Sequence, residues 1–453
     1  MCSVSVMTTA VNFRIEMRGA IVFLCLGCFA EATLKPAPVA ACLLFDSPVE
    51  SPAEELSFDH LTDSFGSVRF TTDRTSVDDD LIFSLLVHCD QSTPDMPLIV
   101  RLGSDEPGCS CLEAIISENG PWMLKPQSGN LEPNPKSWHH LANVLYLDLD
   151  SGVGYNVQDP TDKNEVLNLN EATIDDNLQA SKFCKFFRKY IKKHSDVSGP
   201  VTLVTRGSGA QTAAAIVEEF HDTEDETIAA VLLESPTVDL EAQLGAIPKT
   251  LAAKGQGVVK ERCRYFWEKM KRTFSDPAKA TKKYLDSYAA STLPPADDAI
   301  GRFNALDVEK DRAHARFNDL SERFFRQPRI SQCFLRTTDG DYRRSRDLSP
   351  QSKLGRYSAP VDVLGLAGLT DLTLVYGTDS LLCNPIGLSK TLQLASRALG
   401  LKMKSFDQNG LQGRKGHSGG LTVVECNATG YYALREHPGL GYHLMRELLG
   451  RNA

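Results

Sequence analysis

Ser208 lies between two glycines in segment 201–216, whose sequence is Val-Thr-Leu-Val-Thr-Arg-Gly-Ser-Gly-Ala-Gln-Thr-Ala-Ala-Ala-Ile. The segment has the pattern of a strand, a tight turn and an Ala-rich helix. Such a turn can project a serine hydroxyl beyond a sheet, where the amino end of the helix helps to stabilise an oxyanion. Small neighbours are needed, and Gly207 and Gly209 meet this need whereas Arg206 does not. The pattern predicts a nucleophilic serine, with a structural loop as the alternative.

The segments around this turn predict a sheet covered by helices. Short apolar runs rich in β-branched or aromatic residues occupy 81–87, 97–102, 142–147, 201–205, 228–233 and 372–376. Helical patterns separate several of these runs. The one at 176–190 has apolar residues at a spacing that fits one buried face, namely Leu178, Phe183, Phe186, Phe187 and Tyr190. Alternation of strands and helices is typical of an α/β protein with a mainly parallel sheet.

Segment 247–356 differs from this pattern because it is helical and basic. Between 254 and 283 it has ten Lys or Arg residues against three acidic ones. We interpret 247–356 as a helical cap inserted between two parts of the core, 57–246 and 357–453. Its basic amphipathic helix either packs on the core with a solvated charged face, or binds an acidic partner or a membrane surface.

Composition and charge exclude several classes of protein. The 453 residues are 42% hydrophobic and 24% charged, as in an ordinary folded protein. A net charge of −9 offers no basic surface for a polyanion, so we expect no nucleic acid partner. Arg14 and Arg18 precede a short apolar run and Ala30-Glu-Ala32, which is the pattern of a signal peptide over 1–32, with an N-terminal core helix as the alternative. The run is too short to cross a bilayer, so no membrane span is expected.

The cysteines suggest one or two disulfides in the mature chain, in which nine of the 12 would remain after removal of the leader. No pair of CxxC motifs is present, and His139-His140 next to a turn is interpreted as solvated, so we expect no metal site and no cofactor. After the leader, Asn427-Ala-Thr429 is the one Asn-x-Ser/Thr sequon.

Several motifs resemble the serine carboxypeptidase family in order and spacing. They are Pro97-Leu-Ile-Val-Arg-Leu-Gly-Ser-Asp-Glu-Pro-Gly-Cys-Ser-Cys111, Glu118-Asn-Gly-Pro121, Asn134-Pro-Lys-Ser-Trp138, Ala142-Asn-Val-Leu-Tyr-Leu147, Gly152-Val-Gly-Tyr155, Gly377-Thr-Asp-Ser-Leu-Leu-Cys-Asn384 and Leu421-Thr-Val-Val-Glu-Cys-Asn-Ala-Thr-Gly-Tyr431. The resemblance extends from about residue 65 through most of the chain. It implies an α/β-hydrolase fold with an inserted helical cap, and it puts Cys109 where the family has a disulfide to the cap. Cys263 and Cys333 are both possible partners.

The same resemblance implies a broken catalytic triad. In the family, His takes the proton of the Ser, Asp orients the His, and backbone amides hold the oxyanion. Ser208 stands at the nucleophile position, but the Asp position is Ser380 and the His position is Tyr431. A serine hydroxyl without a base is a poor nucleophile.

The supporting residues of the family site also differ. Glu106 stands at one oxyanion-donor position and Gly209 at the other, and Gly207 replaces a Glu that helps to bind the carboxyl group of the substrate. Glu118 alone remains of that carboxyl-recognition set. Asp379, with His437 or His417, would keep the order Ser, Asp, His as a displaced triad. A shift of one residue along a strand turns a side chain to the opposite face, which argues against Asp379.

We therefore expect a secreted or endolysosomal serine-carboxypeptidase-like protein that has lost peptidase chemistry and acts by binding. The cleft between core and cap would hold a peptide or protein ligand. The alternative is an active serine-type carboxypeptidase that releases C-terminal residues through Ser208, with Asp379 and His437 as displaced partners.

Overall fold

The computed structural model describes residues 68–78, 80–91, 93, 95–103, 110–125, 129–156, 176–195, 197, 199–223, 228–239, 242–243, 245–246, 249–250, 320–335, 342, 360–380, 383–408 and 410–451. The expected leader at 1–32 lies outside these residues, as do Glu106 and Cys109. No helix in the described ranges combines the length and the apolar character that crossing a bilayer requires.

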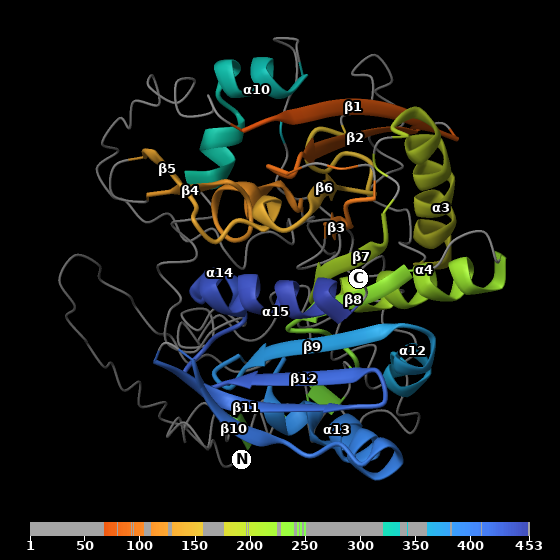
Figure 1. Ribbon diagram of the computed structural model, residues 1–453, viewed down its shortest axis with the longest axis vertical. Helices are drawn as coiled ribbons and strands as arrows, with labels where there is room; N and C mark the ends of the chain where they lie inside the picture. Colours follow the sequence, from red (N-terminus) through yellow and green to blue (C-terminus); the bar gives the residue numbers. More distant parts are fainter. Residues whose placement is uncertain are drawn as a thin grey trace, which may run out of the picture. The chain divides into compact units, whose positions relative to one another are not determined.

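A ten-stranded sheet runs through the described part of the chain, in the order β1-β2-β6-β3-β7-β8-β9-β12-β11-β10. Figure 1 shows this order from β1 near the top to β10 near the bottom. The strands are β1 (Phe70–Val77), β2 (Asp80–Val87), β3 (Leu98–Leu102), β6 (Asn143–Leu147), β7 (Val201–Arg206), β8 (Ile228–Glu234), β9 (Asp371–Gly377), β10 (Lys404–Gln408), β11 (Leu411–Ser418) and β12 (Leu421–Cys426). The central strands from β6 to β12 are parallel, and the strands at both edges are antiparallel.

Both faces of the parallel strands are buried, which explains their continuous apolar sequences. One face packs on α3 (Asp176–Lys193), α4 (Gly209–Thr223), α12 (Val363–Leu369) and α13 (Pro385–Leu399). The other packs on the 3-10 helix η2 (Leu112–Ile116), on α10 (Pro328–Leu335), α14 (Ala433–Glu436) and α15 (Pro438–Arg451). Successive residues alternate between the faces, as Leu203 and Val204 do on β7. A separate hairpin pairs β4 (Trp122–Leu124) with β5 (Leu131–Pro133).

These elements confirm the expected α/β class and each of the six strands predicted from apolar runs. The prediction for the first helix was wrong at Leu178, which is 62% exposed. At 100° per residue, position 178 lies about 140° around the helix from Phe183, so it faces away from the core. Gln179 and Ala180 are buried instead.

The two predicted parts of the core share one sheet, because β8 from the first part pairs with β9 from the second. Most of the predicted cap, 247–356, lies outside the described residues, and its boundaries stay a prediction. Within it, 320–325 and α10 are helical. The hydroxyl of Tyr155 donates a hydrogen bond of 2.8 Å to the carbonyl of Phe325, which attaches this segment to the core.

The described cysteines form no disulfide with one another. Cys89, Cys111, Cys184, Cys333, Cys383 and Cys426 are free thiols. Cys333 is therefore not the partner of Cys109 in this structure. The other candidate, Cys263, lies outside the described residues.

Candidate active site

The turn that carries Ser208 joins the carboxyl end of β7 to the amino end of α4. Its first residue, Gly207, has a φ of +57°, which a residue with a side chain rarely adopts. Two backbone hydrogen bonds fix this conformation: Gly207 N–H donates to the Glu234 carbonyl at 3.0 Å, and Thr237 N–H donates to the Gly207 carbonyl at 2.9 Å. Ser208 does not have a positive φ. The strained position of this strand-to-helix turn is therefore occupied by Gly207.

The hydroxyl of Ser208 makes no hydrogen bond to an acid–base group among the described residues. Ser208 is 1% exposed. No hydrogen-bond partner for its Oγ is present among the described residues. In a nucleophile elbow the serine Oγ is exposed above the sheet and bonded to a base. Neither condition holds at Ser208.

The positions expected for the catalytic Asp and His are part of the packed interior. Ser380 follows β9, is fully buried, and accepts a hydrogen bond of 3.1 Å from Cys383 N–H through its Oγ. Tyr431 follows β12 and is 1% exposed, with its ring packed edge-on against Tyr432 at a centroid separation of 5.3 Å. Its carbonyl accepts a hydrogen bond of 2.7 Å from Ser235 Oγ. These residues lie at the same carboxyl edge of the sheet as Ser208, but they supply no base.

Asp379 and His437, the proposed displaced partners, form hydrogen bonds with Thr429 and not with Ser208 Oγ. Asp379 N–H donates to the Thr429 carbonyl at 2.9 Å, and the Asp379 carboxylate accepts a hydrogen bond of 3.2 Å from Thr378. His437 Nε2 lies 3.0 Å from Thr429 Oγ1. Neither side chain contacts Ser208 Oγ.

His417 lies at the amino end of the parallel strands, whereas Ser208 lies at their carboxyl end. It pairs with Thr422, the second residue of β12, and its Nδ1 lies 2.9 Å from Thr422 Oγ1. Because β7 and β12 run in the same direction, Thr422 is near the end where β7 begins, while Ser208 follows the end of β7. His417 is therefore not placed to act on Ser208.

Beside the turn lies a group of buried ionic side chains, which we call the buried charge cluster. Its members are Arg101, Arg206, Arg435, Glu113, Glu118 and Glu234. Arg206 donates from Nε to Glu234 at 2.7 Å and from its terminal nitrogen to Glu118. Arg101 adds a contact of 3.3 Å to Glu118. Arg206 thus bridges the two carboxylates, in a region from which water is excluded.

Arg435 and Tyr432 complete the cluster from the C-terminal end of the chain. Arg435 lies 3.5 Å from Glu113 and 3.5 Å from Glu118. The ring of Tyr432 lies between two guanidinium groups, 4.6 Å from Arg206 and 4.4 Å from Arg435. Cation–π attraction at such distances stabilises the stacked arrangement.

The pKa of Glu118 and the pKa of Glu234 shift in opposite directions. Burial would raise the pKa of Glu118, but the three guanidinium groups, led by that of Arg206, outweigh burial and lower this pKa to about 2. Burial raises the pKa of Glu234, and the nearby Glu118 charge adds to this effect against the arginines. Glu118 is therefore ionised at every physiological pH and is neutralised by groups of the protein itself.

Sequence reasoning identified Glu118 but missed its partner Arg206 and the second carboxylate that Arg206 binds, Glu234. The available signal was Arg206 itself, a large charged residue where the turn requires small ones. Of the predicted oxyanion donors, Gly209 is buried as the first residue of α4. Glu106 lies outside the described residues.

One further group of side chains has the composition of a metal site. Asp90, His139 and His140 bring ligand atoms within 4.8 Å of one another, in the part of the chain that the structure describes. Burial and the neighbouring His140 lower the pKa of His139 to about 4. This group is not at the carboxyl edge of the sheet and is considered separately below.

Comparisons with known proteins agree on one family. The family model described as serine carboxypeptidase matches residues 75–343. The lysosomal protective protein of Mus musculus is 37% identical over 101 residues, which cover 22% of this chain and 21% of that protein. Serine carboxypeptidase-like 14 of Arabidopsis thaliana is 29% identical over 155 residues, 32% of each. The matched segments thus span less than a third of these curated relatives.

A solved structure supports the fold over a longer range. The crystal structure of Kex1(delta)p, a prohormone-processing carboxypeptidase from Saccharomyces cerevisiae, superposes with a TM-score of 0.65 and 16% identity, covering 85% of this chain and 92% of that one. At this level of identity the similarity concerns the fold, and it confirms the α/β-hydrolase architecture.

Proposed function

Because this chain belongs to the serine carboxypeptidase family, we propose that it keeps the fold of the family, lacks peptidase chemistry and acts by binding. One observation carries this proposal: the Ser208 hydroxyl is buried and has no hydrogen-bond partner among the described residues. Without a base, the hydroxyl stays protonated and cannot attack a peptide carbonyl.

The turn itself supports the proposal. The strained position, from which an elbow presents its nucleophile, has no side chain because it is Gly207. Ser208 is the next residue, with its side chain packed inside. On this proposal, two features remove nucleophilic function: Ser208 follows the strained position by one residue, and Tyr431 stands at the base position that the family resemblance implies.

The buried charge cluster also argues against recognition of a substrate carboxyl group by the mechanism of the family. Glu118 already contacts Arg206, Arg101 and Arg435. An incoming C-terminal carboxylate would have to displace these ion pairs, which costs several kcal/mol in a buried site. A ligand in the cleft between core and cap is therefore held by other contacts.

The compartment belongs to the same proposal. The leader at 1–32 is typical of entry into the secretory pathway, and the mouse relative is named lysosomal protective protein. We infer a secreted or endolysosomal location.

A fluorophosphonate probe tests the loss of chemistry, because it reacts with activated serines. The purified secreted protein is incubated with the probe at pH 5 and pH 7.5, with Ser208→Ala as the matched control and an active serine carboxypeptidase as the positive control. We expect labelling of the positive control alone. Labelling that disappears in Ser208→Ala would instead establish the active peptidase with displaced partners such as His437.

A further inference from the structure

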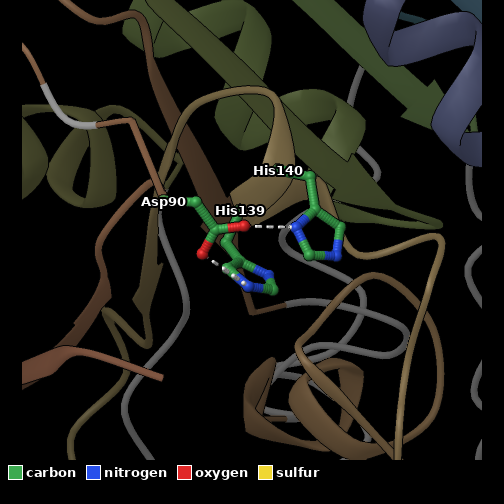
Figure 2. Close-up of side chains that lie close together, drawn as sticks. All are labelled: Asp90, His139 and His140. Atoms are coloured by element: carbon green, nitrogen blue, oxygen red, sulfur yellow. Dashed lines mark hydrogen bonds and ion pairs between the residues drawn. The ribbon is translucent and has the colours of Figure 1, made fainter. Parts of the chain in front are cut away.

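Three polar side chains lie close together just beyond the end of β2. Asp90 follows β2, and His139 and His140 end the short 3-10 helix η3 (Trp138–His140). Figure 2 shows one oxygen of the Asp90 carboxylate directed at the ring of His139 and the other at the ring of His140. One carboxylate oxygen lies 3.5 Å from His139 Nε2, and the other lies 2.6 Å from His140 Nδ1. The ring centroids are 4.1 Å apart.

The backbone holds these residues together without help from a ligand. Asp90 N–H donates to the His139 carbonyl at 3.3 Å. The neighbouring Cys89 N–H donates to the side chain of Asn143 at 2.9 Å. The pairing of β2 with β6 continues this contact into the sheet. The positions of the three side chains are thus set by the fold.

Hydrogen bonds also fix which nitrogen of His139 is free to bind. Ser137 Oγ donates to the Asn119 carbonyl at 3.0 Å, so toward His139 it acts as an acceptor. His139 Nδ1 lies 2.6 Å from this oxygen and therefore carries the proton. In the neutral ring, Nε2 then has a lone pair, and it faces Asp90. Ligating histidines typically bond through their second nitrogen in this way.

The separation of His139 Nε2 from Asp90 suits a shared cation. Two lone pairs that face each other repel unless a positive charge lies between them. Ligands about 2.0–2.1 Å from a tetrahedral Zn²⁺ are about 3.3–3.4 Å apart. The observed 3.5 Å is close to this spacing. The 2.6 Å contact of His140 is a hydrogen bond, which a metal would replace after a small rotation of two partly exposed side chains.

We propose that Asp90, His139 and His140 bind a divalent transition-metal ion of the zinc type. Two imidazoles and one carboxylate are a ligand set that suits Zn²⁺ and leaves at least one position for water. This site is separate from the turn at Ser208, because η3 precedes the amino end of β6, whereas Ser208 follows the carboxyl end of the parallel strand β7. A bound ion would join β2 to η3, which are far apart in sequence. This proposal departs from the sequence-based expectation of no metal site.

Calorimetric titration of the untagged, chelator-treated full chain with ZnCl₂ tests the proposal. We expect saturable binding of one ion per chain. His140→Ala, at a partly exposed position, should weaken binding by more than about tenfold, and Ser137→Ala should weaken it by about tenfold because His139 loses its orienting partner. Circular dichroism checks that both variants are folded.

His443→Ala is the matched control, because His443 Nε2 also lies near a carboxylate, 3.1 Å from Glu447, but without a second histidine. Its affinity for Zn²⁺ should equal that of the unchanged protein. Absence of saturable binding, or binding that His140→Ala leaves unchanged, would overturn the proposal and leave an ordinary ion pair at Asp90.

Discussion

Arg206 and Glu234 face each other across neighbouring parallel strands, and Arg206 Nε donates a hydrogen bond of 2.7 Å to the Glu234 carboxylate. The other carboxylate oxygen of Glu234 accepts the backbone N–H of Leu434 at 2.8 Å. One ion pair thus connects the turn at Ser208 to helix α14. Ionic side chains therefore occupy the interior of this protein beside the turn at Ser208.

Replacement of Arg206 should be strongly destabilising. Arg206→Leu leaves Glu118 and Glu234 buried with less positive charge, and an unpaired buried charge costs about 3–5 kcal/mol. Urea unfolding followed by circular dichroism measures this loss. A control is Lys185→Leu, which removes an exposed pair with Asp78 and should cost no more than about 1 kcal/mol.

The losses of stability caused by replacing Arg206 and Glu234 should also be non-additive. Arg206→Leu combined with Glu234→Leu removes both charges, so the double variant should lose less stability than the sum of the two single variants. A strictly additive result would mean that the two side chains do not interact in the folded protein.

Asp148 should make the protein more stable in mildly acidic solution. Its burial raises its pKa to about 6, although Ser110 and Cys111 donate hydrogen bonds to it. The folded state therefore binds a proton that the unfolded state releases near pH 4. The resulting stabilisation, up to about 3 kcal/mol, is present below pH 4 and is lost as the pH rises to 6.

Unfolding free energies of Asp148→Asn between pH 4 and pH 7 measure this contribution. The variant should lose the part of the pH dependence that Asp148 causes and should be at least as stable as the unchanged protein at pH 7. Asp73→Asn is a control with the opposite pH dependence. Burial favours a higher pKa for Asp73, but hydrogen bonds from Lys193 and His194 outweigh it and lower this pKa. The contribution of Asp73 to stability is therefore lost as the pH falls. Identical pH profiles for Asp148→Asn and the unchanged protein would refute the assignment.

Gly207 should not tolerate a side chain. Gly207→Ala forces alanine to a φ of +57° and should cost about 1–2 kcal/mol. Gly400→Ala isolates the backbone effect, because Gly400 has a φ of +69° and open space around an added Cβ. Gly439→Ala, in α15 with open space and no positive φ, should be neutral or stabilising. Thermal unfolding compares the three, and equal stability for Gly207→Ala and Gly439→Ala would exclude strain at the turn.

Asn427 should carry a glycan when the protein is made with its own leader. Asn427 is exposed in the turn after β12, which gives a glycosyltransferase access to its side chain. Treatment with an endoglycosidase should lower the mass of the secreted protein, and Asn427→Gln should remove this difference. A secreted protein of unmodified mass would contradict the prediction.

The sequence predicted five of the six parallel strands, all except β12, for a clear physical reason. Strands buried on both faces are continuous apolar runs, such as those of β7 and β8. The edge strands β1, β10 and β11 were not predicted, because their sequences are polar and largely exposed or half-buried. Their positions depend on pairing with neighbours, which a local pattern does not reveal.

The sequence predicted which residues belong to the candidate site better than it predicted how they are arranged. Ser380 and Tyr431 lie at the expected carboxyl edge, but the conformation of Gly207 is a property of the backbone that the letters Gly-Ser-Gly do not specify. The partnership of Arg206 with Glu118 joins segments 88 residues apart. The contact of Asp90 with His140 likewise spans 50 residues. Such long-range contacts follow from the register of the sheet.

The pairing of β8 with β9 affects how this chain is made on the ribosome. β8 ends at Glu234 and β9 begins at Asp371, so β8 emerges long before its neighbour is synthesised. In that interval β8 has an unpaired, apolar edge, and such edges promote aggregation between nascent chains. Chaperones that cover this edge would therefore raise the yield of folded protein. A chain truncated before Asp371 would keep this edge of β8 unpaired.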